Sequence, residues 1–256
     1  MVETIDLAAE IKAASKAKVA AEPWGTVKGR IVWGGQEIPK RVPVVVAPTH
    51  NDHRFCTKDG EFLDDDWIID PKGKGLKNVF VWLAPAEAEG KLAIHPARQK
   101  IAESEKNVVI DQPICMFVPH ALAMREGQKL VVKNSAKVPH SFKWAGGDTN
   151  PGGNRTIVPG DQLDLEIKAD SRLILLGCAF HLWMKGAILA LDHPYFAVTD
   201  EQGRFEIKDA PAGTCQLMIR HSTGIWLGGA KGRSGKAITI EPGDNDQDTL
   251  EYPPPQ

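Results

Sequence analysis

Short apolar runs, separated by turns that contain Gly and Pro, make up most of the chain beyond residue 24. Such runs, rich in Val, Ile and Leu, are typical of β-strands, and their close spacing favours β-sandwiches or barrels over alternating strand–helix units. The predicted strands cover residues 25–33, 41–48, 65–70, 77–85, 106–110, 120–124, 129–134, 164–169, 172–177, 186–191, 204–209, 214–221 and 236–242. The pattern therefore predicts a mainly β protein.

The two ends of the chain depart from this pattern. In the Ala-rich segment "IDLAAEIKAASKAKVAA" the apolar residues recur roughly on one side, and Pro23 follows the segment. This spacing predicts a short N-terminal helix over residues 1–24. At the other end, the acidic stretch "EPGDNDQDTLEYPPPQ" predicts a solvated segment, with residues 251–256 as the final tail.

Composition limits the classes of function. The 256 residues are 42% hydrophobic and 25% charged, with a formal net charge of -2, which is ordinary for a folded soluble protein. Lys and Arg alternate with Asp and Glu, so no basic stripe suits nucleic acid or an anionic membrane surface. No apolar run is long enough to predict a membrane span, and the first residues carry Glu and Lys where a secretory signal is apolar. We therefore expect neither nucleic acid nor a membrane span.

One loop brings three kinds of metal ligand together. The stretch "GCAFHLWMKG", residues 177–186, spaces Cys178, His181 and Met184 as C-x-x-H-x-x-M. A blue-type copper site needs a thiolate, two imidazoles and a weak axial thioether. A short loop cannot surround a metal, so the second imidazole must come from another strand. His140 follows the apolar run 129–134 after a turn, and we predict that it lies at the same end of a sandwich.

Zinc, a dinuclear copper centre and no metal at all are the alternatives to a single copper ion at this site. Zinc accepts Cys and His ligands, but structural zinc usually completes its tetrahedron with stronger donors than a thioether, so Met184 favours copper. A dinuclear copper centre needs two bridging cysteines, and this loop holds only Cys178. A β-domain that carries these residues and binds no metal is the remaining alternative.

Two stretches carry a resemblance to a known family. "FVPHALAMREGQKLVVKNSAKVPHSF", residues 117–142, is followed by "LILLGCAFHLWM", residues 173–184, and together they resemble the cupredoxin family of plastocyanin, pseudoazurin and amicyanin. The short ligand loop is most similar to that of amicyanin. The resemblance implies a Greek-key cupredoxin β-sandwich over residues 107–192. It also implies one copper per chain, with His140, Cys178, His181 and Met184 as its ligands.

The sequence departs from this family directly after the first ligand. Cupredoxins usually place Asn there, and its side chain braces the cysteine loop, whereas this chain has Ser141. Trp183, beside Met184, is a bulky neighbour for the axial side of the site. Because contacts around the ligands orient them, both positions bear on the tuning of the metal.

Several cysteines and histidines lie outside the predicted ligand set. On an alternating strand Cys115 shares a face with Phe117, which in the resembling proteins points inward near the metal end. Cys115 could be a buried thiol, a further ligand, or half of a disulfide with Cys56. We favour the disulfide, since an unpaired thiol beside copper is a redox hazard. His50 and His53, in the polar loop "APTHNDHRFC", are predicted to be solvated loop residues.

The C-terminal part carries a second resemblance. The stretch "TDEQGRFEIKDAPAGT", residues 199–214, is similar to the transthyretin-like regulatory β module of carboxypeptidases. A cupredoxin joined to such a module resembles bacterial methylamine-utilisation or plastocyanin-like proteins. We therefore divide the chain into an N-terminal helix (1–24), a β-rich region packing on or completing the sandwich (25–106), a copper domain (107–192), a regulatory-like module (193–250) and a tail (251–256).

These expectations combine into one functional hypothesis. The resemblance implies a periplasmic or secreted type 1 copper protein, its signal peptide removed, that carries single electrons. A redox partner would dock where His181 reaches an exposed edge, beside Phe180, Leu182 and Trp183. An enzyme is not expected, because four protein ligands leave no open position for substrate. The alternatives are a copper carrier or sensor, and a structural β-domain protein with a vestigial copper site.

Overall fold

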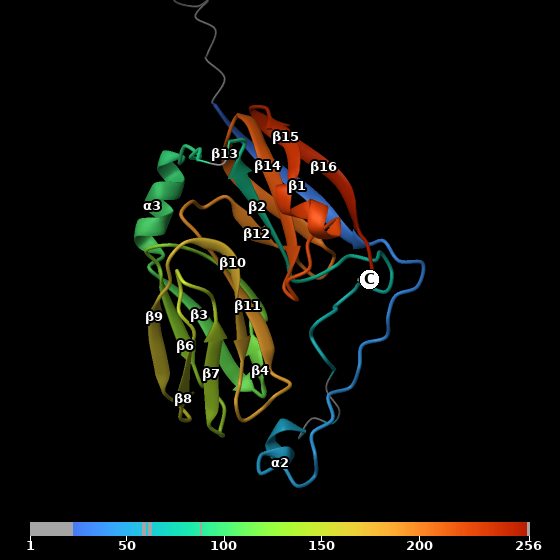
Figure 1. Ribbon diagram of the computed structural model, residues 1–256, viewed down its shortest axis with the longest axis vertical. Helices are drawn as coiled ribbons and strands as arrows, with labels where there is room; N and C mark the ends of the chain where they lie inside the picture. Colours follow the sequence, from blue (N-terminus) through green and yellow to red (C-terminus); the bar gives the residue numbers. More distant parts are fainter. Residues whose placement is uncertain (1–22, 58–59, 61–62, 88, 255–256) are drawn as a thin grey trace, which may run out of the picture.

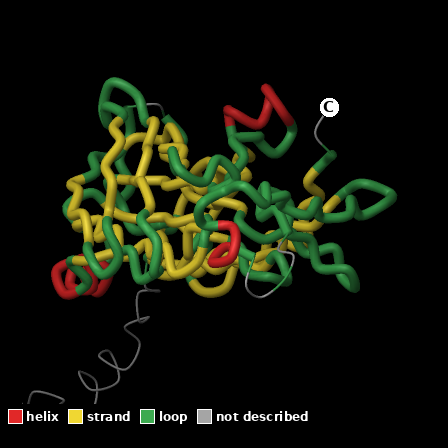
Figure 2. The backbone as a smooth tube through the Cα atoms, turned by 90° about the horizontal axis from the view of Figure 1, so that it is seen from below, coloured by secondary structure: helices red, strands yellow, loops and turns green. Residues whose placement is uncertain are grey.

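The computed structural model describes residues 23–57, 60, 63–87 and 89–254. Within them the chain is mainly β, as predicted, and forms several sheets. The helix predicted over residues 1–24 lies outside the described residues, except that Trp24, at its end, begins strand β1. Strands form two bodies, one above the other (Figure 1). Helical segments are short in every view (Figure 2).

The lower body consists of the strands between residues 107 and 191. They are β3 (Asn107–Ile114), β4 (Met116–Val118), β5 (Ala121–Arg125), β6 (Lys129–Lys133), β7 (His140–Ala145), β8 (Gly153–Ile157), β9 (Gln162–Glu166), β10 (Asp170–Gly177) and β11 (Lys185–Leu191). One sheet has the order β5-β11-β10-β7-β8, and the other has the order β4-β3-β6-β9. Side chains from both sheets share one apolar cluster, which includes Ile110, Phe142 and Ile188. The lower body is therefore a β-sandwich.

The upper body combines strands from both ends of the chain. They are β1 (Trp24–Trp33), β2 (Val79–Pro85), β12 (Phe196–Val198), β13 (Arg204–Pro211), β14 (Gly213–His221), β15 (Lys236–Ile240) and β16 (Gly243–Tyr252), with a 3₁₀-helix η1 (Gly229–Ser234). The sheets have the orders β13-β1-β16 and β12-β2-β14-β15. The early strands β1 and β2 therefore share sheets with the C-terminal strands. Helix α3 (Pro96–Ser104), which the apolar pattern did not predict, lies beside both bodies (Figure 1).

The two bodies pack face to face through strands that are apolar on both sides. On β2, Val79, Val81 and Leu83 point into the upper core, while Phe80 and Trp82 point into the cluster between the bodies. Strand β11 behaves in the same way, since Leu189 joins that cluster and its neighbours point into the lower core. Successive side chains of a strand point to opposite faces. This explains why "VFVWLAP" and "GAILAL" are almost continuously apolar.

Two predicted strands are wrong. Residues 41–48 and 65–70 make only isolated bridges, at Pro43 and Ile69. Both segments belong to a long excursion between β1 and β2 that runs down the side of the lower body (Figure 1). Pro43 and Pro48 flank the valines and cannot donate to a strand ladder. Val45 is accordingly exposed.

The C-terminal segment has mostly exposed residues, as predicted, but residues 251 and 252 of the predicted tail belong to a strand. Residues 243–252 form β16, which pairs in parallel with β1 along most of its length. Its Asp residues face solvent, but Tyr252 is fully buried in the upper core and its hydroxyl donates a hydrogen bond to the carbonyl of Ile225. Burial of this aromatic ring and the pairing with β1 outweigh the acidic composition.

Among the described residues, no helix has the length and apolar character that a membrane crossing requires.

Candidate metal centre

Neighbouring strands bring the predicted ligands to one end of the lower sandwich. His140 is the first residue of β7, and Cys178 directly follows the last residue of β10. Because β7 and β10 pair antiparallel, the start of one lies beside the end of the other. The loop from β10 to β11 then carries His181 and Met184 back toward the same place.

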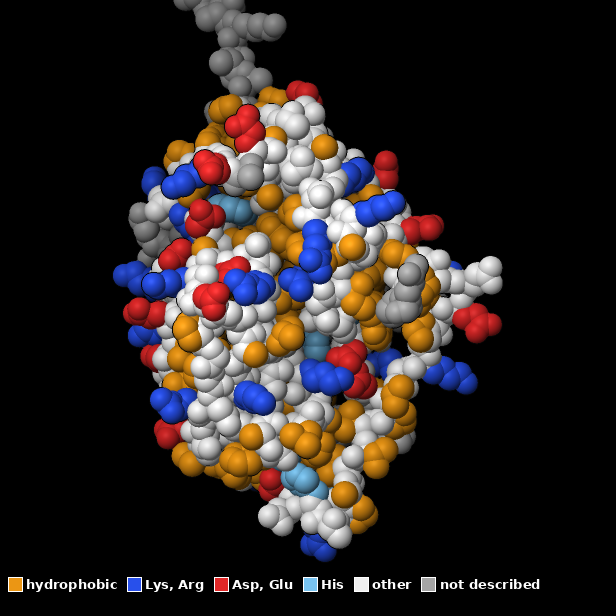
Figure 3. Space-filling model, in the orientation of Figure 1, with side chains coloured by type: hydrophobic (Ala, Val, Ile, Leu, Met, Phe, Trp, Pro, Cys, Tyr) orange, Lys and Arg blue, Asp and Glu red, His pale blue; other side chains and the backbone are white. Residues whose placement is uncertain are grey.

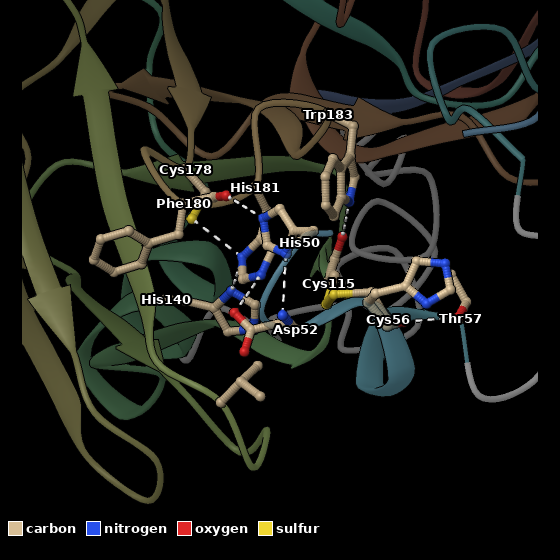
Figure 4. Close-up of a disulfide and its surroundings, with 12 residues drawn as sticks. His50, Asp52, Cys56, Thr57, Cys115, His140, Cys178, Phe180, His181 and Trp183 are labelled. Carbon is tan, nitrogen blue, oxygen red and sulfur yellow. Dashed lines mark hydrogen bonds and ion pairs between the residues drawn. A yellow bond between two sulfur atoms is a disulfide. The ribbon is translucent and has the colours of Figure 1, made fainter. Parts of the chain in front are cut away.

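Three of the four predicted ligands converge in a buried cluster. The Nδ1 atoms of His140 and His181 are 3.0 Å apart, and the Sγ of Cys178 lies 3.7 Å from Nδ1 of His181. One donor atom from each residue lies within 4.8 Å of the other two, and all three side chains are buried (Figure 4). Two imidazole nitrogens and a thiol sulfur therefore form a donor set of the kind that binds copper or zinc.

Met184, the fourth predicted ligand, follows His181 on the same loop. Its backbone N–H donates to the carbonyl of His181 at 2.9 Å, which turns the loop back toward β11. Its side chain is buried in the same apolar cluster as Cys178 and Phe142.

Ser141 links strand β7 to the loop that carries Cys178. Its hydroxyl oxygen accepts a hydrogen bond from the backbone N–H of Ala179 at 2.6 Å. Its own backbone N–H points at Cys178 Sγ at 3.3 Å. The short side chain and the backbone N–H of Ser141 therefore both link β7 to the ligand loop.

Replacing Ser141 with Ala is expected to lower the free energy of unfolding by about 0.5–1.5 kcal/mol, because the N–H of Ala179 then loses its acceptor. Denaturant titration measures this loss. The matched control is Ser135→Ala, which removes an exposed hydroxyl bonded to Asp111 and is expected to cost less. Equal losses in the two variants would show that Ser141 does not brace the loop.

Hydrogen bonds define how the two imidazoles present their nitrogens. Nε2 of His181 lies 3.1 Å from a carboxylate oxygen of Asp52, so this nitrogen carries the proton and Nδ1 keeps its lone pair. Nε2 of His140 is buried and has no partner. Burial lowers the pKa of His140 to about 4 and also lowers the pKa of His181, with Asp52 opposing the shift. Both rings are neutral near pH 7, which is the form that binds metals.

The loop of residues 47–57, here called the covering loop, lies over His181. It contains helix α2 (His53–Cys56), which follows Asp52. Nδ1 of His50 accepts from the N–H of Asp52, so its Nε2 donates to the carbonyl of Phe180 at 3.0 Å. The prediction that His50 is a solvated loop residue is therefore wrong, and His53 is likewise half-buried. The only sequence signal was the proximity of His50, Asp52 and Cys56 along the chain.

The prediction that His181 reaches an exposed edge is wrong, because the covering loop lies over this residue. His181 is completely buried, so it presents no edge to a partner. Trp183 is half-buried and donates from its indole N–H to the carbonyl of Cys115. Of the predicted docking residues, Phe180 and Leu182 are exposed, at 42% and 82%. Hydrophobic side chains gather at this lower end on the face shown in Figure 3.

A disulfide holds the covering loop to the sandwich. Cys56 and Cys115 are bonded, which confirms the favoured alternative. Both sulfurs lie within 4.8 Å of a ring nitrogen of His181 (Figure 4). The free cysteines of the described residues are Cys178 and Cys215, and Cys215 is buried in the upper core. The pairing therefore leaves Cys178 as the free thiol of the donor cluster.

Comparison with known proteins gives structural likenesses only. No family model matches the chain, and no curated protein matches it. A purple cupredoxin from Nitrosopumilus maritimus is similar at 18% identity, covering 32% of this chain and 98% of its own, with a TM-score of 0.28. A reduced amicyanin mutant is similar at 13% identity (43% and 98% coverage, TM-score 0.29), and a Cu(I) amicyanin mutant at 15% (40% and 99%, TM-score 0.30). Structural neighbours of the chain thus include cupredoxins, but likenesses this weak carry no argument about its chemistry.

Proposed function

We propose that the protein is a type 1 mononuclear copper protein that carries single electrons between redox partners. The observation that supports this most strongly is the convergence of two neutral imidazole Nδ1 atoms and a free thiol in one buried cluster. In this proposal His140, Cys178 and His181 would hold the copper, and Met184 would supply a weaker thioether ligand. Bound copper supplies a one-electron Cu(II)/Cu(I) couple.

The protein's own residues account for the rest of the function. Strands β7 and β10 fix two ligands through their antiparallel pairing, and the Ser141 hydroxyl fixes the loop between the ligands. These contacts would hold the ligands in place when the copper changes oxidation state, which would keep the reorganisation that opposes electron transfer small.

The donor set favours copper over zinc. It also favours electron transfer over catalysis. A thioether is a poor ligand for structural zinc but a common weak axial ligand in blue-copper sites. Four protein ligands leave no coordination position for substrate. The exposed Phe180 and Leu182 of the ligand loop form the proposed docking surface for a redox partner. A surface this small agrees with electron-transfer encounters, which are weak and small in area.

The proposal extends to the domains and the compartment. We place the copper domain at residues 107–192 and a transthyretin-like module in the C-terminal part. Strands β1 and β2 pair with its strands and so belong to it rather than to the copper sandwich. The Cys56–Cys115 disulfide favours an oxidising compartment, periplasmic or extracellular.

Redox titration of the copper-loaded protein tests electron transfer against copper carriage. We expect a reversible one-electron transition, with the visible band bleached on reduction and recovered on reoxidation. Copper content measured before and after the cycle is expected to stay constant. Loss of copper on reduction would contradict the electron carrier and favour a copper carrier.

A further inference from the structure

A carboxylate from outside the copper sandwich reaches one of the proposed ligands. Asp52 lies on the excursion between β1 and β2, more than a hundred residues from His181 along the chain, yet its Oδ2 is 3.1 Å from Nε2 of that ring. The Asp52 side chain is 21% exposed, while the His181 side chain has no exposure. The ring is thus held between the donor cluster on its Nδ1 side and a carboxylate on its Nε2 side (Figure 4).

The position of Asp52 is specified by several independent contacts. Its carbonyl accepts from the N–H groups of Phe55 and Cys56 in helix α2, and its own N–H donates to His50 Nδ1. His50 in turn donates to the carbonyl of Phe180, inside the ligand loop. The disulfide of Cys56 ties the end of α2 to the sandwich. The carboxylate therefore approaches His181 on a supported segment rather than on a freely moving side chain.

We infer that Asp52 is a positioning residue for the copper ligand His181, which it orients and makes a stronger donor through the hydrogen bond at Nε2. The inference rests on the proposed function and deepens it. A carboxylate that accepts the second N–H of a ligating imidazole fixes its tautomer and ring orientation and raises its basicity. A more basic imidazole favours Cu(II) over the softer Cu(I), so Asp52 lowers the reduction potential.

The covering loop could instead only shield His181 from solvent, with the charge of Asp52 having no effect on the metal. Asp52→Asn separates the two roles, because an amide has almost the same shape and can still accept from Nε2 but carries no charge. Asp52→Glu restores the carboxylate. The matched control is Asp164→Asn, which removes the same charge from β9, where Asp164 pairs with Lys129.

The experiment measures copper affinity by chelator competition and reduction potential by spectroelectrochemical titration in the full chain. In Asp52→Asn we expect Cu(II) affinity to fall about 10- to 100-fold. If Cu(I) affinity is unchanged, a tenfold fall raises the potential of a one-electron couple by about 59 mV. We expect Asp52→Glu to recover part of both changes and Asp164→Asn to show neither.

The outcomes separate this inference from the proposed function. If the parent protein binds copper with a reversible couple and Asp52→Asn has the same affinity and potential, Asp52 does not act on the metal and the inference fails alone. If the parent protein itself shows no copper-thiolate band, the proposed function fails before the variants are compared. A count of free thiols in each variant checks that the Cys56–Cys115 disulfide is intact.

Discussion

Cys178→Ala is expected to abolish the intense visible band of the copper-loaded protein completely, because that band arises from charge transfer between the cysteine thiolate and Cu(II). The Sγ of Cys178 lies in the donor cluster, 3.7 Å from Nδ1 of His181. Its removal leaves two imidazoles and a thioether, a weaker set for copper. We therefore also expect a large fall in Cu(II) affinity. Absorption spectra and copper content measure both effects.

The chain contains a matched control for this variant. Cys215 is the other free and buried cysteine, but it lies in the core of the upper body with Leu217 and Ile238. Burial raises the pKa of the Cys215 thiol to about 11, so it stays protonated and behaves as a small apolar side chain. Cys215→Ala is expected to lose some stability and keep the full band. A band that survives in Cys178→Ala and disappears in Cys215→Ala would place the copper elsewhere.

Loss of the Cys56–Cys115 disulfide is expected to produce the largest change in stability. The bond closes a loop with a sequence separation of 59 residues, for which restriction of the unfolded chain stabilises the protein by about 4 kcal/mol. The double variant Cys56→Ala, Cys115→Ala should show this loss in denaturant unfolding. Reduction of the parent protein should give a similar loss.

The same variant tests what the disulfide does for the covering loop. Without the bond, the covering loop keeps the hydrogen bonds of His50 and Asp52 to the ligand loop and the packing of Phe55 on the lower core. We expect faster hydrogen exchange at residues 52–57 and a copper spectrum that is shifted but not abolished. The sandwich ligands His140 and Cys178 do not depend on the loop. Unchanged exchange and unchanged stability would show that the loop is held by its other contacts.

Local sequence patterns predicted much of the fold and the donor cluster. The mainly β class followed from short apolar runs between turns, and most predicted runs correspond to strands. The ligand loop was visible because Cys178, His181 and Met184 are close in sequence. His140 was predicted because it follows the apolar run 129–134 after a turn, and the resemblance to cupredoxins implied the same residue. Each of these signals lies within a few neighbouring residues.

The features that the sequence did not reveal depend on contacts between distant segments. Asp52 and His50 meet His181 across about 130 residues, and a polar loop gives no local sign of such a contact. The same holds for β16, because its acidic composition gives no sign that it pairs with the distant strand β1. Residues 41–48 were predicted to form a strand and do not, because the prolines that flank the valines cannot donate to a strand ladder. Long-range contacts decided the first two cases, and the local effect of proline decided the third.

The most direct test of the central claim is the visible absorption and EPR spectrum of the purified protein after addition of Cu(II), with copper content and free thiols counted on the same sample. We predict an intense thiolate-to-copper band, an EPR signal typical of type 1 copper, and about one copper per chain. A colourless protein that binds no copper, with Cys178 confirmed as a free thiol, would contradict the copper site.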